Sequence, residues 1–369
     1  MKILHINAGL ENGGGLYHII QLLKEARVKN APFTLLTLAE GPVSQAAREA
    51  GIKTETFSKS SRYQLSILKD LKNYINEGQY DIVHTHGARA NLFLSMIHRQ
   101  ISAKWVVTVH SDPLKDFESH GAIGKVFTKL NCHSLKKADG VLAVTDRFKN
   151  QLIKDIKLNP QKVSTIYNGI SFTQKPLSKI EHEGFNIVNV ARLVPIKGHK
   201  LLLQAIKNAN IPNLKLHLVG DGPLEDELKQ YVSEHQLSNQ VEFHGYLKQS
   251  QINQLYQITD LAVLTSYSES FPLVMLEASD ANVALLMTKV GDYQVMIPNQ
   301  EQGFVADVGS VEMIISQLKK AYQMYLNQTL PAIAQRERDY LSTNFSIENQ
   351  FNSIMKIYHQ ILEGCKNDL

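Results

Sequence analysis

The sequence predicts an α/β protein made of two doubly wound parallel sheets, and three observations lead to this prediction. Short apolar runs alternate with amphipathic stretches from the N-terminus onward, which is the pattern of parallel strands joined by crossover helices. The same alternation restarts after a polar segment near the middle of the chain. The length of 369 residues is too great for one ordinary core and suits two domains.

The first half of the chain contains apolar runs of strand length, each bounded by turn-forming residues. These runs are KILHINA, FTLLTLA, DIVHTHG, KWVVTVH, GVLAVT and VSTIYNG. Helical periodicity appears between several of them, over 16–29, 64–76, 89–99 and 122–137. We therefore expect residues 1–170 to form an N-terminal domain in which helices cover both faces of a sheet.

A polar, proline-containing segment without periodicity follows at 171–184 and is expected to be a linker. The second domain is expected over 185–345, with strands at NIVNVAR, LKLHLVG, VEFHGYL, LAVLTS, VALLMT and GFVADV. The last segment has apolar positions at helical spacing, so we expect a helix at about 346–369 that packs back on the N-terminal domain. Two such sheets would share a cleft at the carboxyl ends of their strands, where open parallel sheets bind ligands.

Composition narrows the class of protein. Hydrophobic residues make up 43% and charged residues 20%, which is ordinary for a globular protein. A net charge of +4 is too small to indicate nucleic-acid binding. Cys132 and Cys365 are far apart and form no C-x-x-C pair, so we expect no disulfide framework or zinc site, and a reducing cytoplasm fits best.

The N-terminus is expected to be a first strand rather than a signal peptide, because His5, Asn7 and Glu11 interrupt the apolar run. No stretch of about 18 uninterrupted apolar residues occurs, so the sequence predicts no membrane-spanning helix. Any contact with a membrane is therefore expected to be peripheral.

The strongest motif is VARLVPIKGHKLLLQA, which reads as a strand ending at Arg192, a short loop, and Lys197 and Gly198 at the start of a helix. Arg192 offers a planar fork of donors and Lys197 a mobile point charge, beside helix amides that favour anions. These groups suit a diphosphate. The alternative interpretation is a pair of solvated basic residues at an ordinary turn.

The second motif is SYSESFPLVMLEASD, in which Pro272 is suited to the first position of a helix. The amides of Leu273 and Val274 would then be free to meet phosphate oxygens. Glu269 precedes this helix and Glu277 lies within it, and the two carboxylates would repel unless each accepted from hydroxyls or cations. The alternative, acids favoured by the helix dipole, explains Glu269 but not Glu277.

The N-terminal half offers weaker signals. The run NGGGLYHII is a glycine-rich turn into a helix, suited to close approach of a phosphate or simply to a tight turn. His84 and His86 share one face of a strand, but no D-x-D and no third clustered ligand accompany them, so we expect strand-end histidines and no metal site. His110 also ends a strand, where it could bond a sugar hydroxyl or serve structure.

Four motifs now stand in order: R-x-x-x-x-K-G, LVGDGP, FHGYL and ESFPLVMLEA. This order resembles the C-terminal domain of GT-B-type retaining glycosyltransferases of family four, the glycosyl transferases group 1. The segments NGGGLYHII, DIVHTHG, TVH, ADGVLAVT and IYNGI resemble the family's N-terminal domain more loosely. The resemblance implies two Rossmann-like domains facing a cleft and a soluble, metal-independent enzyme. Such an enzyme transfers a sugar from a nucleotide-sugar donor, UDP-linked by preference, to a glycan, lipid-linked or protein acceptor.

The resemblance also implies roles for individual side chains. Arg192 and Lys197 match the family's diphosphate clamp, which stabilises the charge that develops on the leaving group. Glu277 matches the glutamate that holds the ribose hydroxyls, and Glu269 the one that contacts the donor sugar. His110 matches the histidine that touches the transferred sugar. No general base stands out, and in resembling enzymes the leaving phosphate takes the acceptor's proton.

Further contacts implied by the resemblance are made by backbone or by loops. One group lies beside the donor sugar and phosphates, a second brackets the base, and a glycine pair approaches the phosphate or the acceptor. The group beside the donor sugar and phosphates consists of Ser270 and Phe271 with the amides of Leu273 and Val274. The group that brackets the base is His244, Gly245 and Tyr246, and the glycine pair is Gly13 and Gly14.

The chain departs from the family pattern near the expected outer wall of the donor site. It has ASDAN, ending at Asn282, where relatives usually have an alanine-rich stretch ending in Cys-Gly. It also has Asp292 and Val295 where a second glycine and a glutamate are common. These departures bear on donor selectivity or activity.

Two other functions are compatible with the sequence. A nucleotide-sugar epimerase of the same fold would need an acid and a base in the N-terminal half, where Glu11 and Asp112 form no clear pair. A non-catalytic partner subunit of a glycosyltransferase complex would fit the departures but not the intact clamp and both glutamates.

A weaker hypothesis places a membrane contact on the segment RYQLSILKDLKNYI, whose apolar side chains share one helical face with basic residues around it. The alternative is an ordinary surface helix of the N-terminal domain. The apolar residues are Leu65, Leu68, Leu71 and Ile75, and the basic ones Lys59, Arg62, Lys69 and Lys72.

Overall fold

The computed structural model describes residues 1–11, 13–57, 67–117 and 121–364. The chain forms two compact units, of which unit 1 comprises Met1–Ser171 and the C-terminal segment from Ile347, and unit 2 comprises Phe172–Ser346. The division at residue 171 lies at the beginning of the segment that the sequence marks as a linker.

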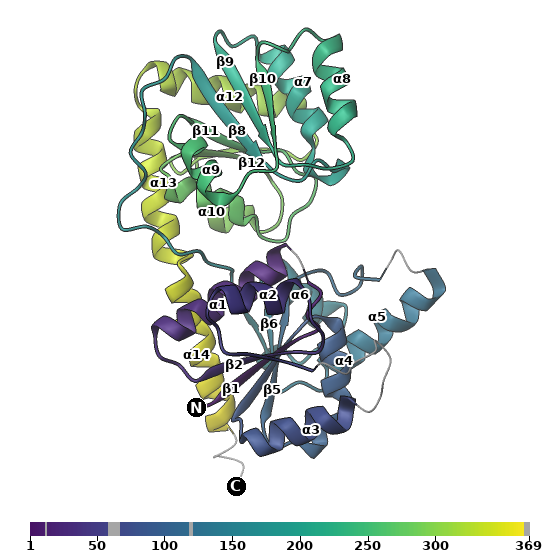
Figure 1. The fold of residues 1–369 in the computed structure, drawn as a ribbon. Helices are drawn as coiled ribbons and strands as arrows, with labels where there is room; N and C mark the ends of the chain where they lie inside the picture. The colour runs from purple at the N-terminus through teal and green to yellow at the C-terminus, as the bar shows by residue number, and fades with distance from the viewer. Residues whose placement is uncertain (12, 58–66, 118–120, 365–369) are drawn as a thin grey trace. The chain divides into compact units, whose positions relative to one another are not determined.

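Unit 1 contains a seven-stranded parallel sheet in the order β3-β2-β1-β4-β5-β6-β7, with helices on both faces (Figure 1). The direction of winding reverses between β1 and β4, so their carboxyl ends leave a crevice for a ligand. The elements are β1 (Ile3–Asn7), α1 (Gly14–Val28), β2 (Phe33–Thr37), α2 (Pro42–Glu49), β3 (Thr54–Thr56), α3 (Ile67–Gly78), β4 (Ile82–His86), α4 (Ala88–Ile97), β5 (Lys104–Val109), α5 (Gly121–Leu135), β6 (Gly140–Ala143), α6 (Asp146–Lys154), β7 (Val163–Thr165) and α14 (Ile347–Gly364).

Alternating strand residues build a core on each face of this sheet. In β1, Leu4 and Ile6 belong to one buried cluster and Ile3 to the other. The second cluster includes side chains of α1 and of the C-terminal helix α14, which lies against α1. Helix α14 is therefore part of unit 1, although unit 2 precedes it in the chain.

Unit 2 repeats the arrangement with a six-stranded parallel sheet in the order β10-β9-β8-β11-β12-β13. Its winding reverses between β8 and β11. One buried cluster joins the sheet to α7, α8, α12 and α13. The elements are β8 (Phe185–Val190), α7 (His199–Ala209), β9 (Leu214–Val219), α8 (Glu225–Glu234), β10 (Val241–Gly245), α9 (Gln249–Tyr256), β11 (Leu261–Leu264), α10 (Leu273–Asp280), β12 (Ala284–Thr288), α11 (Tyr293–Met296), β13 (Phe304–Ala306), α12 (Val311–Leu326) and α13 (Leu330–Asn344).

The predicted linker has no helix or strand, yet it is fixed to unit 2 by hydrogen bonds. Thr173 donates its backbone N–H to Asp280, whose carboxylate also pairs with Arg338 at 3.0 Å. The Lys179 ammonium donates to the carbonyl oxygens of Tyr256 and Thr259, at 3.0 and 2.7 Å. The polar residues of this segment therefore make specific hydrogen bonds to unit 2 and do not form a flexible linker.

The structure corrects two expectations for unit 1. The strand β3, whose three residues show no apolar run, was not predicted. Helix α3 buries Ile67, Leu71 and Ile75 in the core, so the apolar face proposed for a membrane contact is occupied by the fold itself. Lys59, Arg62 and Leu65 lie outside the described residues. Within the described ranges, no helix is both long and apolar enough to cross a bilayer.

Candidate functional site

Three residues that the sequence singles out in unit 2, Arg192, Lys197 and Glu269, lie on loops at the carboxyl ends of β8 and β11, the two strands between which the winding reverses. Arg192 follows β8, and a 3-10 turn of Pro195–Lys197 leads into α7. Glu269 follows β11, and Glu277 lies within the helix after it. Neighbouring parallel strands thus bring together two motifs that are far apart in the sequence.

A glycine brings these two loops into contact. Gly198 is the N-cap of α7 and has a φ of +69°. A Cβ atom at this position would lie 2.1 Å from the carbonyl oxygen of Thr265, directly after β11. Only glycine allows the start of α7 to lie so close to the β11 loop, and this approach places Lys197 beside Glu269.

Lys197 and Glu269 form an ion pair in which the ammonium nitrogen lies 2.6 Å from Oε1 of the carboxylate. Their side chains are only 21% and 12% exposed. The hydroxyl of Ser266 donates to the same Oε1 at 2.6 Å. Glu269 is therefore compensated by a cation of the chain, which the sequence allowed for. Ser266 is a further member of this candidate site that sequence reasoning missed.

Arg192 and Glu277 contrast with this pair. The guanidinium of Arg192 is exposed, and no hydrogen bond joins it to another described residue. Glu277 is half-buried, its carboxyl group likewise has no hydrogen bond to the described part of the chain, and burial raises the pKa of this group to about 7. This carboxyl group has no hydrogen-bond donor from the described chain and is close to ionisation at neutral pH. It is therefore suited to accept hydrogen bonds from the hydroxyls of a ligand.

The N-terminus of α10 adds unpaired amides to the site. Pro272 is the N-cap residue, one position earlier than predicted, and its carbonyl accepts from Met275. The amides of Leu273 and Val274 thus precede the first closed turn of the helix. Gly291, with a φ of +57°, brings the loop after β12 against the carbonyl of Ser270, since a Cβ there would lie 2.6 Å from that oxygen.

The segment expected to bracket a base lies at the end of β10, the edge strand of the sheet. His244 and the buried His217 of β9 face each other at 3.0 Å between Nε2 and Nδ1. Gly245 has a φ of +62° and accepts the N–H of Gly220, which joins the loops after β9 and β10. Tyr246 is 73% exposed, so its ring is free to stack on a planar group.

Unit 1 presents its predicted glycine pair at the beginning of α1. Gly13 is the N-cap and has a φ of +68°. Apart from their chain neighbours and the backbone of α1, no described residue has an atom within 4 Å of the place where a Cβ of Gly13 or Gly14 would stand. The approach to this helix terminus is therefore open. The carboxyl group of Glu11 lies against Gly87, where a Cβ would stand 2.1 Å from Oε1. Burial raises the pKa of Glu11, and the charge of Asp116 also raises it. Asp116 was not singled out in the sequence.

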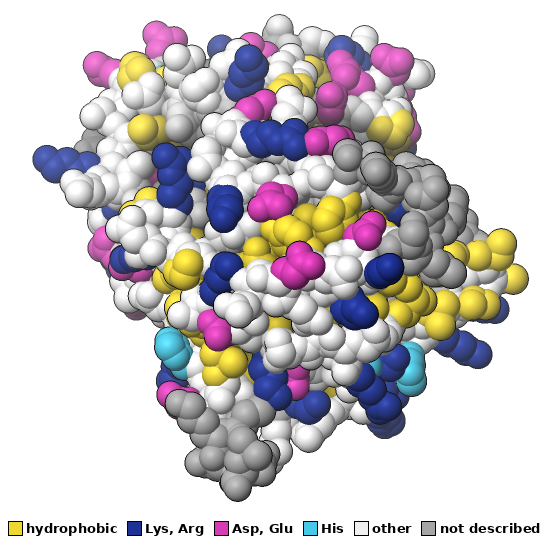
Figure 2. All heavy atoms as spheres, turned by 60° about the horizontal axis from the view of Figure 1, so that its bottom comes forward, with side chains coloured by type: hydrophobic (Ala, Val, Ile, Leu, Met, Phe, Trp, Pro, Cys, Tyr) yellow, Lys and Arg dark blue, Asp and Glu magenta, His cyan; other side chains and the backbone are white. Residues whose placement is uncertain are grey.

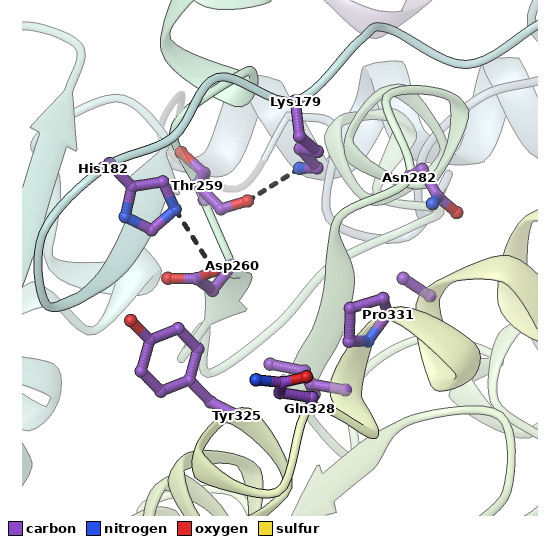
Figure 3. Close-up of a pocket in the computed structure, with 10 residues that line it drawn as sticks. Lys179, His182, Thr259, Asp260, Asn282, Tyr325, Gln328 and Pro331 are labelled. Carbon is purple, nitrogen blue, oxygen red and sulfur yellow. Dashed lines mark hydrogen bonds and ion pairs between the residues drawn. The ribbon is translucent and has the colours of Figure 1, made fainter.

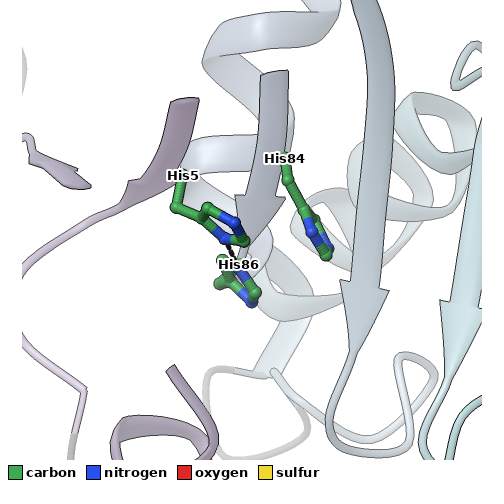
Figure 4. A group of neighbouring side chains, drawn as sticks. All are labelled: His5, His84 and His86. Atoms are coloured by element: carbon green, nitrogen blue, oxygen red, sulfur yellow. Dashed lines mark hydrogen bonds between the residues drawn. The ribbon is translucent and has the colours of Figure 1, made fainter. Parts of the chain in front are cut away.

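His84 and His86 belong to a larger buried cluster, and the expectation that no third ligand accompanies them is wrong. Parallel pairing places His5 of β1 directly beside His84 of β4 on the same face of the sheet (Figure 4). Nδ1 of His5 lies 2.9 Å from Nε2 of His86, whose Nδ1 lies 3.2 Å from Nε2 of His110. His18 of α1 meets the edge of the His110 ring, with the ring centroids 4.6 Å apart.

The alignment of KILHINA with DIVHTHG as neighbouring parallel strands would have revealed His5, but His18 depends on the packing of α1. Burial lowers the pKa of His5 to about 3 and that of His18 to about 4, and it also lowers the pKa values of His84, His86 and His110 well below the usual range. The cluster is therefore a set of neutral imidazoles at pH 7.

Neutral imidazoles are also metal ligands, and three groups in the described residues bring nitrogen or oxygen atoms within 4.8 Å of one another. Each group contains at least two histidines. They are His5, His84 and His86; His18, His86 and His110; and His217, Glu242 and His244.

A separate cavity of about 470 Å³ lies at the opposite, amino end of the unit 2 sheet (Figure 3). Asp260 directly precedes β11 and pairs with His182 at 3.4 Å. Asn282 precedes β12 and lines the same cavity. This corrects the placement of Asn282 at the wall of the donor site, because α10 carries the chain from one end of the sheet to the other. Asp292 follows β12 and stays at the carboxyl end.

Comparison with known proteins places this geometry in a family. The family described as "Glycosyltransferase Family 4" matches residues 12–174, and the family described as "Glycosyl transferases group 1" matches residues 172–337. Between them they span residues 12–337, which include the loops of the glycine pair, Arg192 and Glu269 but neither β1 nor α14.

Full-length relatives agree with this assignment. The chain is 23% identical to an Escherichia coli UDP-Gal:alpha-D-GlcNAc-diphosphoundecaprenol alpha-1,3-galactosyltransferase, over 90% of this chain and 92% of the relative. It is 25% identical to the N-acetyl-alpha-D-glucosaminyl L-malate synthase of Bacillus anthracis, over 83% and 81% of the two chains.

Among solved structures, HepE of Anabaena in complex with UDP superposes with a TM-score of 0.84, at 20% identity and over 98% of this chain and 100% of that one. Similarity at this level of identity concerns the fold. Together, the two matched family regions, the relatives and the two doubly wound sheets establish that this chain is a GT-B-type glycosyltransferase of the group 1 family.

Proposed function

We propose that this enzyme transfers a sugar from a UDP-sugar to a glycan, lipid-linked or protein acceptor, with retention of configuration and without a metal ion. The acceptor belongs to cell-surface polysaccharide or glycoconjugate synthesis at the cytoplasmic side of the membrane. The E. coli relative is named for a UDP-Gal donor and a diphosphoundecaprenol acceptor, and the HepE structure contains UDP, which supports this choice of donor and acceptor classes.

The observation that carries the proposal is the set of charged groups at the carboxyl ends of β8 and β11. Two cations, Arg192 and Lys197, lie on the loop after β8, and two acids, Glu269 and Glu277, follow β11. A diphosphate needs cations and free amides, and a ribose needs a hydrogen-bond acceptor without a partner of its own. Both requirements are met on neighbouring strands.

In the proposed mechanism Arg192 and Lys197 bind the diphosphate and stabilise the charge that develops on it as the glycosidic bond breaks. The pairing with Glu269 fixes the ammonium of Lys197 before the donor arrives, so little reorganisation is required during the reaction. The carboxylate of Glu269 accepts hydrogen bonds from the donor sugar. The leaving phosphate takes the proton of the acceptor on the same face of the sugar, which is why no protein base is assigned.

The acceptor half of the reaction is proposed to use unit 1. Gly13 and Gly14 leave open the amides of the α1 terminus for a phosphate or the acceptor. His110 is neutral, because burial lowers its pKa, so it contacts the transferred sugar by hydrogen bonding rather than by charge. In unit 2, His244, Gly245 and Tyr246 are proposed to bracket the base of the nucleotide.

A panel of UDP, GDP, ADP and their sugar conjugates, measured by thermal shift in EDTA, tests the donor proposal. A ligand at 100 times its Kd stabilises the folded protein by about 2.7 kcal/mol, so the cognate nucleotide should raise the melting temperature distinctly. UDP and UDP-sugars should do so without metal. No response to any nucleotide, or a response that requires a divalent ion, would contradict the proposal.

Product analysis separates the alternative functions. Release of UDP that depends on an acceptor, with the anomeric configuration of the donor preserved, supports a retaining transferase. An isomerised sugar formed without acceptor would identify an epimerase. If the Lys197→Ala variant supported normal glycosylation in cells that require this chain, the role would be that of a non-catalytic subunit.

A further inference from the structure

Helix α5 of unit 1 exposes a row of large apolar side chains. Ile123, Val126, Phe127 and Leu130 are 67%, 56%, 40% and 42% exposed. Their spacing of three and four residues places them on one helical face. The residues that α5 buries are Gly124, Asn131, Ser134 and Leu135, and it packs on α4. Apart from Leu135 at its C-terminal end, the helix therefore turns small and polar residues inward and large apolar ones outward, the reverse of an ordinary surface helix.

The charges of the helix are one-sided. From residue 121 to 138 the chain contains four lysines and no acid. Lys125 and Lys129 of α5 are exposed, and at 100° per residue they lie along a single border of the apolar row. Lys136 is exposed on the turn that follows the helix. Figure 2 shows hydrophobic side chains gathered over the projecting α5 at the right edge, with basic side chains beside them.

We propose that the face formed by Ile123, Val126, Phe127 and Leu130 binds the surface of a membrane that contains anionic lipids. The apolar row enters the boundary between headgroups and acyl chains, and the lysines remain among the headgroup phosphates. This surface replaces the one suggested by α3, whose apolar side chains are buried in the core.

The distribution of charge favours a membrane over a second copy of this chain. Most homodimers are related by a two-fold axis, so the same patch would face itself. Lys125 and Lys129 would then approach the equivalent lysines of the other copy without any acid of the helix to compensate them. An anionic bilayer compensates all of these charges at once.

The position of the helix also suits a membrane-borne substrate. His110 directly follows β5, and α5 is the next helix after that strand. The exposed apolar residues occupy the first two-thirds of α5, which begins at the carboxyl end of the sheet. A membrane bound to α5 therefore lies at the end of unit 1 that carries His110, and only this last step rests on the proposed function.

Sedimentation of the full-length protein with phosphatidylglycerol–phosphatidylcholine vesicles tests the proposal. The double variant Ile123→Ser, Val126→Ser is expected to lose at least tenfold in partition coefficient, because the burial of each side chain is removed. Lys125→Gln with Lys129→Gln is expected to lose roughly fivefold per lysine, and this loss should shrink as salt rises.

Two matched control variants are available on other helices of the chain. Leu326→Ser removes an apolar side chain that is 53% exposed on α12, and Lys69→Gln removes an exposed lysine of α3. Both should bind vesicles like the wild type. All variants should keep the wild-type melting temperature and UDP response, so a failed donor proposal remains distinguishable from failed membrane binding.

Three outcomes would overturn the proposal. The first is no binding of the wild type to vesicles with half of their lipid anionic. The second is equal binding by the α5 and the control variants. The third is a concentration-dependent dimer in sedimentation equilibrium that the Ile123→Ser, Val126→Ser variant abolishes, which would assign the surface to self-association.

Discussion

The carboxyl ends of the two sheets have the same topology but handle polar groups in opposite ways. In unit 2 the functional groups carry charge: Arg192 is exposed, Lys197 is paired with Glu269, and Glu277 has a pKa raised to about 7. In unit 1 the corresponding place is filled with imidazoles whose pKa values burial lowers until they are neutral. The contrast fits the proposal that unit 2 binds its ligand by charge and unit 1 by uncharged hydrogen bonds.

The largest effect is expected from Lys197→Ala. This change removes a preorganised cation from the proposed diphosphate site and leaves Glu269 without its partner. Loss of one such donor typically costs about 100- to 1000-fold in rate, so kcat for sugar transfer should fall by that factor. Steady-state kinetics with the cognate UDP-sugar measures the change.

Lys200→Ala is the matched control for Lys197→Ala. Lys200 is exposed in the first turn of α7 and pairs with Glu227 at 3.3 Å on the surface. Exposed ion pairs contribute about 0–1 kcal/mol, so kcat should be unchanged. If both variants were equally slow, general loss of positive charge, rather than the position of Lys197, would explain the effect.

The neutral histidines of unit 1 should make its stability sensitive to acid. The pKa of His18 is about 4 in the folded protein and about 6.5 in the unfolded chain, so the unfolded chain binds more protons between these values. The stabilisation is present above pH 6.5 and is lost as the pH falls toward 4, by about 1.4 kcal/mol per pH unit for each such histidine. Denaturant unfolding between pH 7.5 and 5 measures this slope.

His18→Gln should reduce that slope by about one proton, while His359→Gln should not. His359 is exposed on α14, whereas His18 is buried and bonded through Nδ1 to Asn168 at 2.7 Å. The alternative outcome is a dependence of stability on pH that is no steeper in the wild type than in the His18→Gln variant. The histidines would then take up protons in the folded state, and the two units would not differ in charge as described.

Glu277 should show the opposite dependence on pH. Burial raises its pKa from 4.5 to about 7, so the folded protein binds the extra proton and stability falls as pH rises through this range. A ribose that donates to the carboxylate favours its ionised form. Binding of UDP near pH 7 should therefore release a proton, which calorimetry in two buffers of different ionisation enthalpy detects.

Glu277→Gln should abolish this proton release and weaken UDP about tenfold, since hydrogen bonds to a charged group contribute about 1.5–3 kcal/mol and an amide retains part of them. Glu234→Gln, which alters an exposed acid of α8, should bind like the wild type. Unchanged affinity in the Glu277→Gln variant would remove Glu277 from the proposed ribose site.

Much of this arrangement could be predicted from the sequence because it depends on local patterns. Apolar runs predict the strands, and the motifs around Arg192 and Glu269 carry their own turn chemistry. The pairing of Lys197 with Glu269 could not be read in advance, because it depends on the close approach that Gly198 allows. The histidine cluster likewise depends on register and on helix packing.

The exposed face of α5 shows the same limit. Ile123 and Val126 lie on a helix whose periodicity fits an ordinary buried face, and only packing on α4 reveals which face is turned outward. By contrast, the pattern of α3 suggested an exposed surface that the fold buries. Periodicity identifies an apolar face, but neighbouring elements decide what covers it.

The smallest effect is expected at Asn282, where relatives of the family usually have glycine. Asn282 has a φ of +56° and lies at the amino end of the unit 2 sheet. Its buried side-chain oxygen has no hydrogen-bond partner among the described residues. Asn282→Gly should stabilise the protein by about 0.5 kcal/mol, since relief of the backbone outweighs the greater freedom of glycine in the unfolded chain. Asn282→Ala should destabilise it by about 1 kcal/mol, because alanine is disfavoured at positive φ.

Neither Asn282 variant should alter the preference among UDP-sugars, because the residue lies at the opposite end of the sheet from Glu269 and Glu277. Competition between UDP-sugars in one reaction measures that preference directly. A changed preference would mean that the amino end of the sheet communicates with the charged end. In that case α10, which contains Glu277 and ends two residues before Asn282, would connect the charged groups of unit 2 to the amino end of its sheet.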